Sequence, residues 1–119
     1  MDASGPAIVS QPITRADLTR IAEQQFGDMV KGVVDVERGV MAIGAELHAD
    51  EEAALLEEGS SQNALWGINL YPGETGDAFL EFDSMINVRP ARGNRSRYVE
   101  SEALRARIRT VVRSLVSDA

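Results

Sequence analysis

The sequence predicts an α+β fold in which a four-stranded, mainly antiparallel sheet is covered by helices on one face. Two patterns support this prediction. Apolar and polar residues alternate in several short segments, as in half-buried strands, and elsewhere apolar residues recur three and four positions apart, as in amphipathic helices. In chain order these segments predict the succession α-β-β-α-β-β-α. The length of 119 residues fits one domain, and we expect a flexible N-terminal arm over residues 1–13 and a single domain over 14–119.

Three amphipathic segments are predicted to be helices. The first begins with a capping-box pattern, in which Thr14 is followed three residues later by Asp17 in place of the usual Glu. The second is expected to be capped by Asp50, because acidic residues favour a helix N-terminus. Ser101 is expected to cap the third, which has an apolar stripe along one side. The predicted helices span residues 15–26, 50–58 and 102–116.

Four alternating segments are predicted to be strands. The last and longest is expected to organise the sheet, since its two faces separate cleanly into apolar and titratable residues. The first two are expected to form a hairpin about Arg38 and Gly39, because glycine adopts the positive φ that a tight turn requires. The four predicted strands span residues 30–37, 40–48, 64–71 and 79–89.

The alternation also predicts one polar sheet face. If the strands share a sheet, their outward side chains gather on one surface, around small residues that would leave its middle shallow. An ordinary solvated face, with surface ion pairs of little energetic value, is the alternative interpretation. The predicted outward polar residues are Lys31, Asp35, Glu37, Glu46, His48, Asn69, Tyr71, Glu81, Asp83, Asn87 and Arg89.

Composition narrows the functional classes. The chain has no cysteine, which excludes disulfides and thiolate chemistry and fits a cytoplasmic protein. No apolar run approaches the roughly 18 residues of a membrane helix, and the N-terminal segment lacks a signal-peptide pattern. The net charge of −7 is uneven: residues 1–85 have a balance of −12, and residues 86–119 have a balance of +5. Such asymmetry is compatible with self-pairing, with anion binding, or with an unevenly charged solvated surface.

Several segments together resemble a known family. They are Val34-Asp35-Val36-Glu37-Arg38-Gly39, Glu46-Leu47-His48-Ala49-Asp50, Leu65-Trp66-Gly67-Ile68-Asn69-Leu70-Tyr71-Pro72, and Ile86-Asn87-Val88-Arg89-Pro90 with Asn94-Arg95-Ser96. This set resembles a family of small bacterial proteins of unknown function, DUF5674, over residues 14–116. The resemblance implies a single compact domain and no activity.

Catalytic and metal-binding candidates lie on the predicted polar face. Glu46 and His48, two residues apart on a predicted strand, would share a face, so the carboxylate could orient the imidazole as a general base. The alternative is that His48 ends its strand and bonds the backbone. Asp35, Glu81 and Asp83, with the neighbouring Glu37, offer oxygen ligands for Mg²⁺ or Ca²⁺, although paired acids on strands are commonly solvated. No cofactor is predicted.

The sharpest local feature is the arginine loop, which we define as residues 89–97. Its glycine and asparagine tolerate left-handed backbone, so successive N–H groups could form a nest for an anion held also by arginine forks. A surface loop paired with the acidic body is the alternative. Arg105, Arg109 and Arg113 form one stripe on the last helix and are interpreted as a solvated flank. The predicted ligand-binding residues are Arg89, Asn94, Arg95, Ser96, Arg97, Asn69 and Asn87.

These observations favour a non-catalytic binding protein, expected to be a homodimer. The polar sheet face and the arginine loop would bind a small anionic ligand or a partner. The alternative is a small enzyme acting on an anionic substrate, with Glu46 and His48 as its acid–base pair and a divalent metal as an option. The isoelectric point near 4.6 argues against a nucleic-acid partner.

Overall fold

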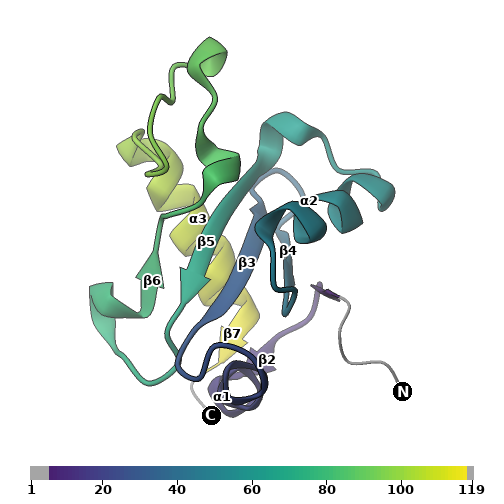
Figure 1. The fold of residues 1–119 in the computed structure, drawn as a ribbon, viewed down its shortest axis with the longest axis vertical. Helices are drawn as coiled ribbons and strands as arrows, with labels where there is room; N and C mark the ends of the chain where they lie inside the picture. Colours follow the sequence, from purple (N-terminus) through teal and green to yellow (C-terminus); the bar gives the residue numbers. More distant parts are fainter. Residues whose placement is uncertain (1–5, 118–119) are drawn as a thin grey trace.

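The computed structural model describes residues 6–117 and has a five-stranded antiparallel sheet at its centre, in the order β1-β4-β3-β5-β6 (Figure 1). A separate parallel pair joins β2 to β7. The predicted mixed fold with an antiparallel sheet is confirmed, but the sheet has five strands rather than four. The strands are Ala7–Val9 (β1), Ile13–Thr14 (β2), Val30–Asp35 (β3), Val40–Ile43 (β4), Leu65–Leu70 (β5), Leu80–Glu81 (β6) and Val116–Ser117 (β7).

The three α-helices of the described chain are Arg15–Gln24 (α1), His48–Glu57 (α2) and Glu102–Leu115 (α3). The predicted capping box of α1 is present: the Thr14 hydroxyl accepts from the Asp17 amide at 3.0 Å, and the Asp17 carboxylate accepts from the Thr14 amide at 3.0 Å. Ser101 caps α3 as predicted, accepting from the Leu104 amide at 3.2 Å. Helix α2 begins earlier than predicted, at His48, and its N-cap is Leu47.

The prediction of one long strand over residues 79–89 is wrong. Only Leu80–Glu81 pairs with β5, and the chain then forms a 3-10 turn at Met85–Asn87, whose N-cap Ser84 accepts from the Ile86 amide. The segment crosses over β5 instead of continuing beside it. Gly67 permits this close approach, because a Cβ there would lie 2.4 Å from the Ser84 Cβ. The sheet is organised instead around β3 and β5, which pair through all six residues of each strand.

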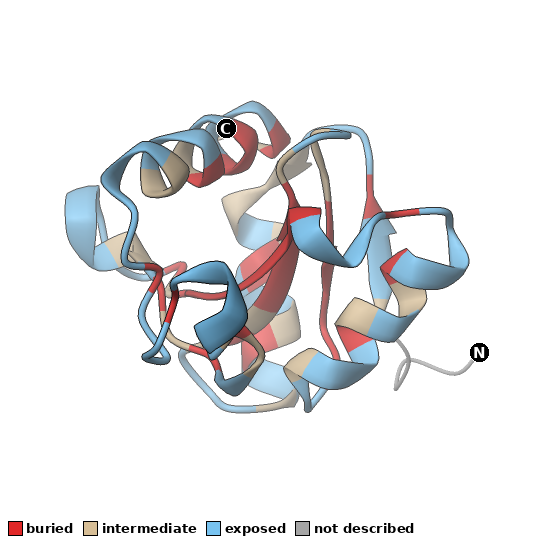
Figure 2. Cartoon of the chain, turned by 90° about the horizontal axis from the view of Figure 1, so that it is seen from above, coloured by how far each residue is buried: buried red, intermediate tan, exposed pale blue. Residues whose placement is uncertain are grey.

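Helices cover both faces of the sheet, and the prediction of cover on one face is wrong. The main core lies between the sheet and helices α1 and α3. On the opposite face, Val33 of β3, Ala42 of β4 and Leu65 of β5 pack against Leu55 of α2. The middle of this second sheet face, which was predicted to be polar and exposed, therefore consists of apolar side chains that pack against α2. Figure 2 shows the buried strands lying between these helices.

Part of the predicted N-terminal arm belongs to the sheet. Ala7–Val9 forms edge strand β1 and pairs with β4, while residues 1–5 lie outside the described residues. Ile13 pairs with Val116, which ties the start of α1 to the end of α3. The predicted hairpin turn is confirmed at Gly39, whose φ is 71°. Within residues 6–117, the helices are too short or too polar to cross a membrane.

Candidate functional site

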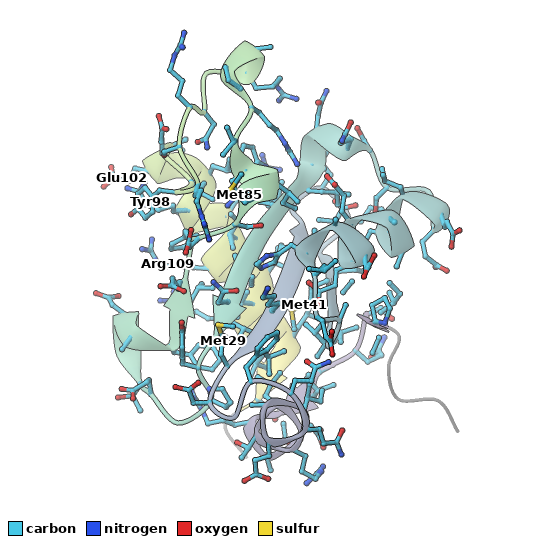
Figure 3. All side chains as sticks on the ribbon, in the orientation of Figure 1. Met29, Met41, Met85, Tyr98, Glu102 and Arg109 are labelled. Atoms are coloured by element: carbon cyan, nitrogen blue, oxygen red, sulfur yellow. The ribbon has the colours of Figure 1, made fainter. Side chains whose placement is uncertain are left out.

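A groove of about 470 Å³ lies beside the N-terminus of α2, at the part of the second sheet face that the helix leaves uncovered. We call it the His48 groove. It joins the start of α2, the start of β3, the end of β5 and the segment that follows β6. Met29, just before β3, and Met85, after β6, line it (Figure 3). Its lining residues are Met29, Lys31, Leu47, His48, Ala49, Asn69, Tyr71, Glu81, Asp83, Ser84, Met85, Ile86 and Arg97.

His48 is the first residue of α2 and is half-buried in the groove. Its Nε2 lies 2.8 Å from the carbonyl oxygen of Ile68. A carbonyl only accepts hydrogen bonds, so Nε2 carries the proton, and in the neutral ring Nδ1 is an acceptor. Burial lowers the pKa of His48, and the positive charge of Lys31 adds to this shift. The hydrogen bonds to the Ile68 carbonyl and to the Asn69 side chain, and the charge of Asp83, oppose it. The imidazole is therefore neutral at pH 7 and offers an acceptor atom.

Asn69, on β5, supplies a second acceptor. Its side chain donates through Nδ2 to the Glu81 carboxylate at 2.9 Å and to the Asp83 carbonyl at 3.1 Å. These two bonds fix the orientation of the amide. Only 5% of the residue is exposed. Its Oδ1 is buried and accepts no hydrogen bond that meets the distance and angle limits among the described residues. An unpaired buried oxygen costs about 1–3 kcal/mol, so this atom requires an explanation.

The remaining polar walls of the groove are paired. Tyr71 donates from its hydroxyl to Glu81 at 3.0 Å; burial and this carboxylate raise the pKa of Tyr71 to about 12, so its phenol stays protonated. Asp83 binds Arg97 at 2.7 Å, in an exposed pair that solvent screens. Lys31 lies over the ring of Phe26. Positive and negative charges are therefore balanced around the two acceptors.

Two successive amides of the arginine loop form an anion nest, but they bind a carboxylate of the chain itself, so binding of an external anion there stays a prediction. The carboxylate of Glu100 accepts from the amides of Arg95 and Ser96 at 3.0 and 2.8 Å, and from the Ser96 hydroxyl at 2.7 Å. The Ser96 hydroxyl bond is the main cause that lowers the pKa of Glu100. These donors are unavailable to an external anion while Glu100 remains bound.

Asn94, predicted to bind a ligand, instead holds the loop together. Its Nδ2 donates to the carbonyls of Asn87 and Tyr98 at 2.8 Å, and to that of Ser96 at 3.0 Å. Its Oδ1 accepts from the Glu100 amide at 2.8 Å. The side chain is 5% exposed and its hydrogen-bonding capacity is used.

Asn87 has a comparable structural role. Its side-chain amide accepts from the Gly67 N–H at 2.8 Å and donates to the Gly67 carbonyl at 3.0 Å, so it replaces a strand partner at the open side of β5. It also donates to the Arg97 carbonyl at 3.0 Å. Asn87 is fully buried and does not line the His48 groove.

Arg89 also lies outside the groove. Its guanidinium stacks over Trp66 at 4.7 Å, pairs with Glu52 at 3.3 Å, and donates to the Ile86 carbonyl at 3.1 Å. Burial lowers the pKa of Arg89, and Glu52 opposes this shift. Of the arginines predicted to bind a ligand, Arg97 alone lines the groove.

The predicted strand that would have aligned Glu46 with His48 is absent, because His48 is the first residue of α2. Glu46 is exposed in the bend before α2, and no hydrogen bond or ion pair links it to His48 in the described part of the chain. The predicted metal ligands also separate: Glu81 and Asp83 line the groove, whereas Asp35 does not. Within residues 6–117, no group of three or more His, Cys, Asp or Glu side chains could hold a metal ion.

Asp35 is buried at the start of the β3–β4 turn. It accepts from the amides of Glu37 and Arg38 at 2.9 and 2.8 Å, and from the Ser60 hydroxyl at 2.6 Å. These bonds hold the turn and link it to the segment before β5, so the carboxylate is already saturated with donors.

Sequence reasoning missed Glu51, a fully buried residue in the first turn of α2. One carboxylate oxygen accepts from the Ala45 amide at 3.0 Å, and the other has no partner among the described residues. Burial raises the pKa of Glu51 to about 9, so the group is a neutral acid at pH 7. The spacing of His48, Glu51 and Leu55 at i, i+3 and i+7 places all three on one helix face, and this signal could have identified it.

Comparison with curated proteins and with solved structures finds no match to this chain. A family model described as "Protein of unknown function (DUF5674)" matches residues 7–115. That range covers the whole sheet, the three α-helices and the His48 groove. The chain therefore belongs to the DUF5674 family.

Proposed function

We propose that this protein is a non-catalytic module that binds a small ligand with hydrogen-bond donors in the His48 groove. The observation that carries the proposal is the Asn69 Oδ1, a buried acceptor without a partner, on the wall of an open groove. A polar atom in this state is stabilised when a bound molecule supplies the missing donor.

The second acceptor is His48. A side-chain hydrogen bond to Asn69 favours the protonated ring of His48. In the neutral ring the Nε2 proton is directed at the Ile68 carbonyl, so Nδ1 is an acceptor beside the Asn69 side chain. A ligand with two N–H or O–H groups can satisfy both His48 and Asn69. Amines, amides and polyhydroxyl compounds have this chemistry. The exposed side chains of Leu47 and Met85 can cover the carbon skeleton of such a ligand.

The test is a titration of the isotopically labelled protein with glycinamide, followed by NMR. We expect shifts of the Asn69 side-chain amide and of the His48 ring resonances. N,N-dimethylacetamide, which accepts hydrogen bonds but donates none, is the matched control and is expected to cause no saturable shift. Loss of one bond to a buried acceptor corresponds to roughly tenfold weaker binding.

Variants make the test specific. Asn69→Leu removes the acceptor and is expected to abolish the saturable response. Asn63→Leu changes an exposed asparagine outside the groove and is the control. Equal responses to glycinamide and dimethylacetamide, or equal responses of the two variants, would contradict the proposal.

The second candidate function is a small enzyme acting on an anionic substrate. The observation in its favour is the lowered pKa of His48, since a general base must be unprotonated at working pH. Arg97, on the same groove, would position the anion. In this case His48→Gln would abolish turnover of a substrate while leaving its binding nearly unchanged, and a pH–rate profile would show one ionisation below the ordinary histidine value.

We also propose that the protein self-associates as a homodimer, supported by the uneven charge along the chain. The arginines of residues 86–119 would then lie against the acidic part of a second copy. Sedimentation equilibrium at low and high salt tests this. A monomer at every protein concentration would exclude it.

A further inference from the structure

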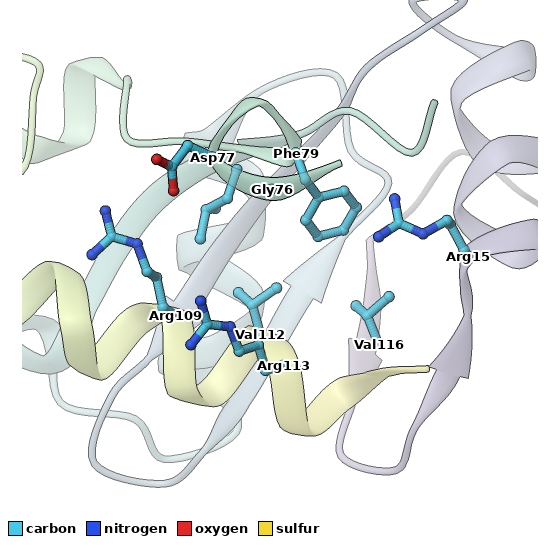
Figure 4. Close-up of a pocket in the computed structure, with 9 residues that line it drawn as sticks. Arg15, Gly76, Asp77, Phe79, Arg109, Val112, Arg113 and Val116 are labelled. Atoms are coloured by element: carbon cyan, nitrogen blue, oxygen red, sulfur yellow. The ribbon is translucent and has the colours of Figure 1, made fainter. Parts of the chain in front are cut away.

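A second cavity, of about 370 Å³, lies on the other side of the sheet from α2, along α3 (Figure 4). We call it the α3 cleft. It is separate from the His48 groove, and no residue lines both. The residues that line it are Arg15, Gly76, Asp77, Phe79, Leu80, Arg109, Val112, Arg113 and Val116.

Long-range pairing builds this cleft. The register of the parallel pair β2–β7 places Thr14 opposite Ser117, so the start of α1 lies next to the end of α3. The segment Gly76–Phe79, which leads into β6, forms the opposite wall. The apolar floor consists of Val112, which belongs to the main core, and of Phe79, Leu80 and Val116, which pack against that core. The cleft therefore has a firm apolar base inside a charged rim.

Two arginines of α3 face this base without acidic partners. Arg109 and Arg113 lie one helical turn apart, an arrangement that is destabilising for like charges. Arg109 contacts the ring of Phe82 at 5.2 Å, and neither guanidinium forms an ion pair within the described residues. Asp77 lies across the cleft from Arg109 and is the sole acidic residue in its lining (Figure 4).

Arg15 forms part of the rim in a fixed position. Its guanidinium lies 4.3 Å from the centre of the Phe79 ring and donates to the carbonyls of Pro72 and Glu74 at 3.1 and 2.8 Å. It keeps the Phe79 ring in place and adds positive potential to the cleft. The local charge is positive, although the whole chain carries −7.

We propose that the α3 cleft binds a compact organic carboxylate, with its anionic head between Arg109 and Arg113 and its apolar body on the Phe79 and Val112 floor. Arginine forks match the two oxygens of a carboxylate. A small aromatic or branched acid suits the cavity volume, which lies near the lower end of the range for ligand sites. An anion without an apolar part would use only the exposed rim, where solvent screens the attraction.

The experiment is an NMR titration with sodium benzoate, compared with sodium acetate and with benzyl alcohol. We expect benzoate to bind saturably and to shift the methyl resonances of Val112 and Val116. Acetate lacks the aromatic ring and benzyl alcohol lacks the carboxylate, so each is expected to bind at least about tenfold more weakly than benzoate. Equal affinity for acetate and benzoate would overturn the apolar part of the proposal, and equal affinity for benzyl alcohol would overturn the anionic part.

The double variant Arg109→Gln/Arg113→Gln tests the arginines. Its control is Arg92→Gln/Arg107→Gln, which removes the same charge outside the cleft. We expect a loss of about tenfold or more in benzoate affinity for the first variant and less than about twofold for the control. A similar loss in both variants would show a general effect of charge and overturn the site. Arg109→Lys/Arg113→Lys keeps the charge and the aliphatic stem, and its intermediate affinity would show that loss of binding does not reflect misfolding.

Discussion

The segment over residues 84–100 and the His48 groove are both rich in polar side chains, but the two regions use them differently. In the segment, Asn87 and Asn94 bond to backbone groups at both ends of the side-chain amide, and Glu100 fills the anion nest. In the groove, the Asn69 amide is bonded at its nitrogen only. A polar side chain whose donors and acceptors are all hydrogen-bonded stabilises the fold. A buried side chain with one unbonded donor or acceptor is the better candidate for ligand binding.

The largest effect on stability is expected from Asn87→Ala, which tests whether this fully hydrogen-bonded asparagine stabilises the fold. The change removes three hydrogen bonds and leaves both backbone groups of Gly67 without that partner. We expect the free energy of unfolding to fall by about 3 kcal/mol. Urea denaturation measures it. The control Asn63→Ala, at an exposed site, should change the same quantity by less than about 0.5 kcal/mol; comparable losses in the two variants would refute the structural role of Asn87.

Glu51→Gln tests the buried acid of α2. Burial raises the pKa of Glu51 from its ordinary value of 4.5 to about 9. Its contribution to stability is therefore complete below pH 4.5 and is lost as the pH rises to about 9, because only the unfolded state releases the proton in that window. Glutamine stays neutral, so the variant should lose less stability with rising pH.

At pH 7 we expect the Glu51→Gln variant to be more stable than the wild type by about 3 kcal/mol, to order of magnitude. At pH 4 the difference should be small. Urea denaturation across this range measures both values. A stability difference that does not change with pH would show that Glu51 is ionised in the folded protein.

Asn69→Ala is expected to have a smaller effect than Asn87→Ala, although both change a buried asparagine. The variant loses the bonds to Glu81 and Asp83 but also removes the unpaired Oδ1. We expect the free energy of unfolding to change by about 1 kcal/mol or less. Parallel urea curves for the two variants measure the contrast. A loss as large as that of Asn87→Ala would indicate that Asn69 is a structural residue.

The smallest effect on stability is expected from Glu100→Ala, because the carboxylate is exposed. Faster amide hydrogen exchange at Arg95 and Ser96 would report the loss of its bonds. The emptied nest should then respond to inorganic phosphate, which the wild-type loop should not. Since the Ser96 hydroxyl lowers the pKa of Glu100, the contribution of this group in the wild type is lost as the pH falls through that lowered value. Slow exchange in the variant would show that the loop does not depend on Glu100.

Local patterns predicted the helices well. Thr14 with Asp17 and Ser101 marked two helix starts, because a cap is a hydrogen bond between residues three positions apart. Alternation over residues 79–89 failed, because a segment that crosses a sheet can show the same period as a strand that extends it. Gly67, in a different strand, is the residue that admits the crossing.

For the candidate site too, the sequence predicted what depends on residue type and failed on what depends on distant contacts. His48, Asn69, Glu81, Asp83 and Arg97 were named from the sequence, and all line one groove. The partners that distinguish them from Asn87, Asn94 and Asp35 come from distant segments or from the turn geometry. Residue type alone does not reveal whether a polar side chain is already satisfied.

By itself, the sequence determined the mixed class of the fold, two of its helix caps, the Gly39 hairpin turn and a set of polar residues that contains the groove. Only the tertiary structure decided that α2 covers the second sheet face, that Glu100 occupies the nest, and that the Asn69 Oδ1 stays open. The physical reason is the separation along the sequence of the residues that interact. Caps and turns are formed by residues a few positions apart, whereas burial and hydrogen-bond satisfaction depend on segments that meet only in the folded chain.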